Sequence, residues 1–181
     1  MNALRLLTAQ HDRLEELSAQ LGEAAAKGEE GRRSALSGFL REARQHFDVE
    51  EACFYPAVSS KLILVEAAPL LEEHQALRAA LDRLEERGQV GGPELEQARK
   101  SLHEKLVQHV SEEEIELFPE VRRRFDVDAL DALGERMERF LEAEPAAVAP
   151  EAATAPEAVA PQQEERPLEQ PEPTEPQHPS G

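Results

Sequence analysis

Hydrophobic residues recur at three- and four-residue steps along most of the chain, a spacing that is typical of amphipathic helices. The first stripe predicts a helix that ends at the loop glycines Gly28 and Gly31. Its inner face carries Leu4, Leu7, His11, Leu14, Leu17 and Leu21. The second stripe predicts a helix from near Arg32 to Pro56, because a proline lacks the amide hydrogen and kinks or ends a helix. Its inner face carries Leu36, Phe39, Ala43, His46, Glu50 and Cys53.

Two further helices are predicted in the same way. The third starts between Ala67 and Pro69 and ends at a group of three glycines, Gly88, Gly91 and Gly92. Its inner face carries Leu70, His74, Leu77, Leu81 and Leu84. The fourth opens at Pro93, because proline is tolerated in the first turn, and runs to Pro119. Its inner face carries Leu95, Leu102, Leu106, His109, Glu113 and Leu117 or Glu116.

A fifth helix is predicted over residues 127–142, where a helical period returns at Leu130, Leu133, Met137 and Phe140 or Leu141. The sequence shows no alternation of the kind that is typical of a strand. Short connections between long helices indicate an all-α fold, an up-down-up-down four-helix bundle. The fifth helix is then an addition, packed outside the bundle or against a partner.

The second half of the chain repeats the first at a distance of 63 residues, in pseudo-repeats of about 1–62 and 64–125. The repeat pairs His11 with His74, His46 with His109, and Glu50 with Glu113. Each half therefore contributes one lone histidine and one His-x-x-x-Glu. On a helix, residues four apart lie on one face about 6 Å from each other, so each His-x-x-x-Glu can serve one metal site.

These six polar residues lie on faces that are otherwise rich in leucine. A buried polar atom without a partner costs about 1–3 kcal/mol, and a charge costs more, so something must compensate each group. Metal coordination compensates all six together, whereas the alternative is a core filled with hydrogen-bonded His–Glu pairs. Imidazole and carboxylate ligands in a helix bundle favour two iron ions, with manganese second. A closed zinc site more often has cysteine ligands.

Composition sets the domain boundary and argues against several functions. Nine of the 13 prolines lie from Pro145 onward, among Ala, Glu and Gln. Residues 144–181 are therefore predicted to be a disordered tail, and residues 1–143 the folded domain. A net charge of −18 without a basic stripe argues against binding to nucleic acid or to a membrane. The lack of a signal peptide, of a long apolar run and of a second cysteine predicts a cytoplasmic protein.

The histidine and glutamate pattern resembles the hemerythrin-like, or HHE cation-binding, domains. The resemblance covers about residues 6–120. It rests on His11, His46-x-x-x-Glu50-Glu51 with Phe54-Tyr55-Pro56, His74, and His109-x-x-x-Glu113-Glu114 with Leu117-Phe118-Pro119. It implies the hemerythrin four-helix bundle and a non-haem di-iron centre, oxo- or hydroxo-bridged. The implied metal ligands are His11, His46, Glu50, His74, His109 and Glu113, with Glu50 and Glu113 bridging the two ions.

One position departs from the oxygen carriers of that family, which have a second histidine one turn after the third-helix ligand. Here Arg78 stands four residues after His74, and a guanidinium cannot be a ligand. The departure argues against reversible oxygen carriage and favours redox chemistry with a ligand such as peroxide. Arg78 is either an ordinary surface arginine or a group that attracts anions to the mouth of the site.

Four other residues near this pattern have two interpretations, and a fifth has one. Glu51 and Glu114 either hydrogen-bond the ligand histidines or are solvated acids. Cys53 is interpreted as a small buried hydrophobe rather than a redox thiol. Tyr55 is interpreted as a packing residue rather than a phenol of the site, and His103 as a surface histidine.

Three functions remain open at this point. The first is a di-iron protein that binds or senses O₂, NO, peroxide, or the iron and redox state. The second is an enzyme that turns over peroxide or NO at the same centre. The third is a metal-free helical module that binds a protein partner through residues 127–142 or the tail.

Overall fold

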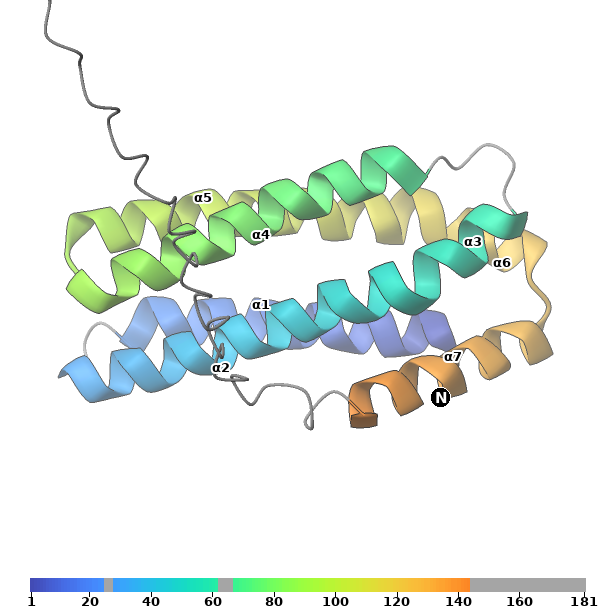
Figure 1. Ribbon diagram of the computed structural model, residues 1–181, viewed down its shortest axis with the longest axis horizontal. Coiled ribbons are helices and arrows are strands. Elements are labelled where there is room, and N and C mark those ends of the chain that lie inside the picture. Colours follow the sequence, from blue (N-terminus) through green and yellow to red (C-terminus); the bar gives the residue numbers. More distant parts are fainter. Residues whose placement is uncertain (25–27, 62–66, 144–181) are drawn as a thin grey trace, which may run out of the picture. The chain divides into compact units, whose positions relative to one another are not determined.

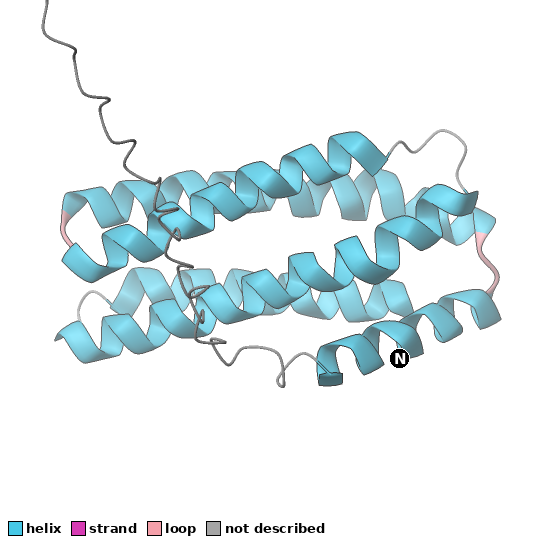
Figure 2. Ribbon diagram, in the orientation of Figure 1, coloured by secondary structure: helices cyan, strands magenta, loops and turns pink. Residues whose placement is uncertain are grey.

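The computed structural model describes residues 1–24, 28–61 and 67–143. Over these ranges the regular structure is entirely helical (Figure 2). The long helices form two hairpins that lie side by side (Figure 1). One joins α1 (Ala3–Ala24) to α2 (Gly28–Val49), and the other joins α4 (Ala67–Val90) to α5 (Pro93–Ser111). The predicted all-α four-helix bundle is confirmed.

Helices α2 and α5 both continue beyond their regular part. Each passes through a π-helical segment, η2 (Glu50–Phe54) or η3 (Glu112–Leu117), into a short helix, α3 (Tyr55–Lys61) or α6 (Phe118–Arg124). Such π-helical turns are often found at functional sites. The prediction that Pro56 ends its helix is wrong, because α3 continues through the proline to Lys61, and a kink there stays a prediction. Pro56 and Pro119 stand at the second position of the short helices, where a proline is tolerated.

The boundary between α1 and α2 also differs from the prediction. Helix α2 begins at Gly28 rather than near Arg32, and Gly31 therefore lies within its first turns instead of ending the preceding helix. The first turn carries Glu29 and Glu30, whose negative charges favour a helix N-terminus. Residues 25–27 lie outside the described residues.

Gly88 does not stop α4, contrary to prediction, but lies inside it. A Cβ atom at Gly88 would stand 2.0 Å from Cδ2 of Leu36, so a larger residue there would require the Leu36 side chain of α2 to shift. The turn between α4 and α5 is made by Gly91 and Gly92, whose φ angles of 77° and 80° favour glycine.

Helix α7 (Val127–Ala143) confirms the predicted fifth helix and packs on the bundle. Its backbone contacts the start of the chain so closely that a Cβ at Gly134 would lie 1.8 Å from the carbonyl oxygen of Met1. The Met1 amino group donates to Glu138 Oε1 at 2.8 Å, and Arg136 donates to the carbonyl oxygen of Cys53. Helix α7 thereby joins the N-terminus to η2.

Two hydrophobic clusters fill the bundle, one on each side of its middle. The first lies around α7, η2 and η3 and includes Leu7, Phe54 and Phe118. The second lies between the long helices and includes Leu14 and Phe47. The four histidines of the long helices and the two glutamates lie between these clusters. The predicted tail of residues 144–181 lies outside the described residues, and its disorder and the domain boundary at residue 143 stay predictions. No described helix is long and apolar enough to cross a membrane.

Candidate metal centre

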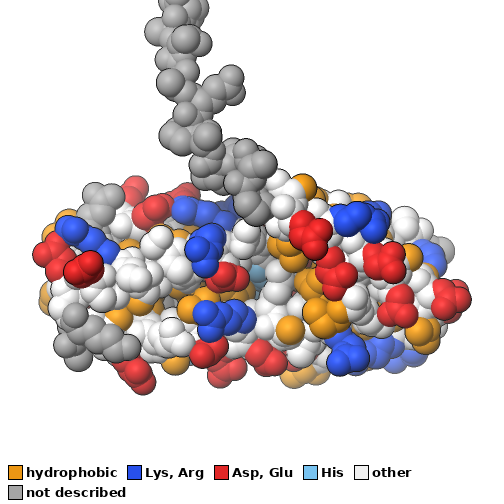
Figure 3. Space-filling model, turned by 90° about the horizontal axis from the view of Figure 1, so that it is seen from below, with side chains coloured by type: hydrophobic (Ala, Val, Ile, Leu, Met, Phe, Trp, Pro, Cys, Tyr) orange, Lys and Arg blue, Asp and Glu red, His pale blue; other side chains and the backbone are white. Residues whose placement is uncertain are grey.

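Each of the four long helices places one histidine at the middle of the bundle. These are His11 on α1, His46 on α2, His74 on α4 and His109 on α5. The π-helical segments add Glu50 and Glu113. All six side chains are buried, with at most 4% of any residue exposed. Figure 3, which presents one face of the molecule, accordingly shows little histidine surface.

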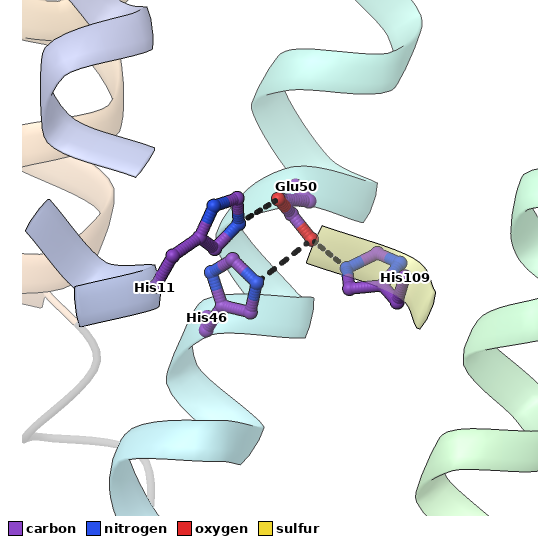
Figure 4. A group of neighbouring side chains, drawn as sticks. All are labelled: His11, His46, Glu50 and His109. Atoms are coloured by element: carbon purple, nitrogen blue, oxygen red, sulfur yellow. Dashed lines mark ion pairs between the residues drawn. The ribbon is translucent and has the colours of Figure 1, made fainter. Parts of the chain in front are cut away.

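The inward-facing atoms of these residues converge on Glu50. Its Oε2 atom lies 3.3 Å from Nε2 of His74, 3.4 Å from Nε2 of His46 and 3.6 Å from Nε2 of His109. His11 Nε2 lies 4.0 Å from the other Glu50 oxygen and 3.3 Å from Oε2 of Glu113. The converging rings and carboxylate are seen in Figure 4.

The spacing of these atoms suits a cation. Ligand atoms of His11, His46, Glu50 and His109 lie within 4.8 Å of one another. Two donors about 2.1 Å from one metal ion are about 3.0–3.4 Å apart for octahedral or tetrahedral angles. Several of the observed separations are close to this range.

Hydrogen bonds within the protein do not satisfy this group. Nine buried side-chain nitrogen and oxygen atoms lack a hydrogen-bond partner among the described residues, and seven of them belong to the site. The seven are His11 Nε2, His46 Nε2, both oxygens of Glu50, both ring nitrogens of His109, and Glu113 Oε2. Buried polar atoms are rarely left unpaired in folded proteins. The donor set therefore fits a metal, which would use most of these atoms as ligands.

The outer nitrogen of each histidine faces a polar group on a neighbouring helix or its extension. The Nδ1 distances are 2.8 Å from His11 to Glu114, 2.9 Å from His74 to Glu51, 3.3 Å from His46 to Gln10, and 3.8 Å from His109 to Glu73. The last is too long for a hydrogen bond. Partners of this kind hold a proton on Nδ1 and leave the Nε2 lone pair free for a metal. Glu51 and Glu114 are thus hydrogen-bond partners of histidines rather than solvated acids.

Tyr55 also reaches the site, although a packing role was favoured from the sequence. Its hydroxyl donates to Oε1 of Glu113 at 2.8 Å and lies 2.9 Å from Nε2 of His74. Its counterpart in the repeat is Phe118, whose ring instead stacks on that of His11 at 5.9 Å. A tyrosine in one repeat where the other has phenylalanine was the signal available in the sequence.

At two residues of this group, Glu113 and His46, burial decides the direction of the pKa shift. It raises the pKa of Glu113 to about 7, an effect that the negative charge of Glu50 reinforces. Burial also lowers the pKa of His46 to about 3. A cation at this position stabilises charged carboxylates and neutral imidazoles together. These are the forms in which both residue types bind metals.

Arg78 does not behave as an isolated surface arginine. Its guanidinium donates to Asp48 at 2.5 Å and to Glu51 at 3.1 Å, and Glu51 in turn holds His74. The Arg78 charge is therefore engaged by two carboxylates and supports the outer contact of a candidate ligand. This engagement leaves little basis for the interpretation that Arg78 attracts anions.

The structure brings all six predicted residues to one place. The tightest group contains four of them, whereas His74 and Glu113 contact Tyr55. Cys53 is buried in the cluster around α7, as expected for a small hydrophobe. His103 is exposed, and its Nδ1 lies 3.3 Å from the hydroxyl of Ser18.

Comparison with known proteins agrees with this geometry. The model of the hemerythrin HHE cation-binding domain family matches residues 2–121. A solved structure of a hemerythrin HHE cation-binding domain-containing protein from Mycobacterium kansasii is similar, with a TM-score of 0.67 and 28% identity. The match covers 81% of this chain and 91% of that one. No curated protein matches the chain. With a buried His/Glu cluster at its centre, the chain belongs to the hemerythrin HHE cation-binding domain family.

Proposed function

We propose that His11, His46, Glu50, His74, His109 and Glu113 hold two iron ions. The rings form two pairs, because the centroids of His11 and His46 are 4.9 Å apart, as are those of His74 and His109. The separations between the pairs are longer, 5.9 Å from His46 to His109 and 6.3 Å from His11 to His109. One pair for each ion, with the two carboxylates between them, accounts for all six residues. Imidazole and carboxylate donors in a helix bundle favour iron, with manganese as the second choice.

The proposed function is the binding or sensing of a small ligand such as O₂, NO or peroxide at this centre. The observation that carries it is the convergence of six unpaired buried atoms from α1, α2, α5 and the two π-helical segments inside an apolar bundle. A di-iron centre supplies redox chemistry with such ligands when it is bound. The protein supplies the dry surroundings, the fixed imidazoles and the two carboxylates.

A second candidate function, an enzyme that turns over peroxide or NO, is favoured by Tyr55. Its hydroxyl is a buried proton donor beside Nε2 of His74, on the inner side of the site. A donor in that position can stabilise or protonate a small ligand, which reversible binding does not require. The metal-free interaction module has less support, because the apolar face of α7, including Leu130, Leu133 and Met137, is buried on the bundle.

Metal analysis and an optical spectrum of the aerobically purified protein test the proposal. We expect close to two irons per chain and loss of both in His46→Ala and His109→Ala. His103→Ala is the control, because that histidine is exposed and lies outside the site. One zinc without iron, or unchanged metal in the two site variants, would refute the proposal. Steady-state consumption of peroxide then separates the enzyme from the sensor.

A further inference from the structure

A groove with a volume of about 310 Å³ lies along the seam between α1 and α5. Its walls carry Val107 and Ile115, large apolar side chains that are 54% and 71% exposed. Its acidic members are Asp12, Glu15 and Glu114, and it has no lysine or arginine in its lining. The groove is therefore partly apolar and negatively charged.

This groove reaches the candidate metal centre. His11 and Glu114 both form part of its lining, and His11 Nδ1 lies 2.8 Å from Glu114 Oε1. The opposite nitrogen of the same ring is the unpaired Nε2, which lies 3.3 Å from Glu113. Two other grooves, of about 380 Å³ beside α4 and α5 and about 400 Å³ beside α1 and α7, contain none of the six candidate ligands in their linings.

The internal repeat explains why this seam is open. The equivalent seam, between α2 and α4, is filled by Phe47 and by Arg78, whose guanidinium lies 5.7 Å from the centre of that ring and bonds Glu51. At the repeat positions the α1–α5 seam has the smaller Val110 and the acidic Glu15. Glu15 carries the same charge as Glu114 and cannot replace the Arg78–Glu51 bond. Phe47 and Arg78 thus occupy the α2–α4 seam, whereas the α1–α5 seam contains the groove.

We propose that the α1–α5 groove is the entrance for small uncharged ligands of the centre and that its carboxylates hold back anions. The inference rests on the proposed function and adds the route by which a ligand reaches the centre and the selection against negatively charged ligands. Apolar walls suit nitric oxide, which is weakly hydrated, and the groove carboxylates do not repel it or hydrogen peroxide because both molecules are uncharged. Carboxylates in a cleft with low-dielectric walls repel an anion and lower its association rate.

The proposed entrance is tested by placing a larger side chain in the groove of the iron-loaded protein. Val107→Trp should slow nitric oxide binding, followed optically in a stopped-flow instrument, by roughly tenfold, since it occupies the entrance. Val90→Trp is the matched control, because Val90 is 80% exposed at the end of α4 and does not line the groove. Iron content and helical content are measured first for each variant.

The charge part is tested with azide as the anionic probe. Glu15→Gln should raise the azide association rate by roughly threefold at low salt and leave that of nitric oxide unchanged. Glu16→Gln is the control, since Glu16 is exposed and does not line the groove. Equal azide rates in Glu15→Gln and its control would overturn the charge selection.

The outcomes separate this inference from the proposed function. Wild-type protein without iron would refute the proposed function, and the entrance with it. Normal iron content together with unchanged nitric oxide rates in Val107→Trp would overturn only the entrance. If Val107→Trp does not fold, Val110→Phe provides the same test, because it copies the residue that fills the equivalent seam.

Discussion

Removing the metal should destabilise this domain by an amount comparable with its whole stability. Six inward-facing atoms of the site have no hydrogen-bond partner among the described residues, and each costs about 1–3 kcal/mol when left unpaired. Their sum is about 6–18 kcal/mol, against about 5–15 kcal/mol for the unfolding of a typical domain. Entry of water and protonation recover part of this cost. We therefore expect the metal-free protein to lose at least about 5 kcal/mol of its free energy of unfolding.

A loss of that size is easily measured. For a domain of this length, each kcal/mol shifts the melting temperature by about 3 °C, so chelation should lower it by about 15 °C. The assay is thermal unfolding, followed by the helical signal in circular dichroism. It compares the purified, the chelated and the iron-reconstituted protein. His46→Ala provides the control, because a chelator should have no further effect on a protein whose site is already empty.

The result that would refute this reasoning is a change in melting temperature of less than about 3 °C between chelated and reconstituted protein. It would mean that the four histidines and two carboxylates satisfy one another without a cation. The hydrogen-bonded His–Glu core, the alternative considered from the sequence, would then be correct. A large loss that reconstitution fully restores would support metal as the partner of these atoms.

Three further variants test individual contacts. Tyr55→Phe should keep the fold but alter the optical spectrum of the iron-loaded protein and its rate of peroxide consumption, because the hydroxyl contacts two candidate ligands. An unchanged spectrum would show that the hydroxyl lies outside the centre. Arg78→Gln should weaken iron binding about tenfold in a competition titration, because Glu51 loses its partner and holds His74 less firmly. Arg44→Gln is the control, since it removes a similar α2–α4 ion pair away from the site and should leave iron binding unchanged. Gly134→Ala should lower the free energy of unfolding by about 1–3 kcal/mol, because its Cβ would meet the Met1 carbonyl oxygen at 1.8 Å. Gly22→Ala is the control, since its Cβ would make ordinary contacts at 3.5 Å. Equal stabilities of the two variants would show that α7 can shift freely.

The sequence predicted the helices, and the inward position of the six candidate ligands, for a physical reason. A helical period fixes which residues face inward, and a 63-residue repeat places equivalent residues at equivalent points of two hairpins. A buried histidine such as His46 is then conspicuous because its neighbours on the same face are apolar. No knowledge of tertiary contacts is needed for these steps.

Other features depend on contacts that the sequence does not display. Gly88 resembles a helix stop until Leu36 is seen to occupy the space of its missing side chain. Tyr55 resembles a packing residue because its hydroxyl meets Glu113 only when the two hairpins are assembled. The π-helical turn before Pro56 likewise rotates the chain without any composition signal.

The differences between the two repeats also bear on where a ligand would stand in the proposed centre. The α1–α5 groove is lined in part by His11, and the ring of His11 stacks on that of Phe118, the repeat counterpart of Tyr55. The hydroxyl of Tyr55 stands on the other half, beside His74 and Glu113. A molecule entering by the groove therefore passes an apolar side before it meets the only phenol of the chain. If the groove is the entrance that we propose, a ligand would enter on one side and meet the Tyr55 hydroxyl on the other, an arrangement that agrees better with the proposed enzyme than with simple release.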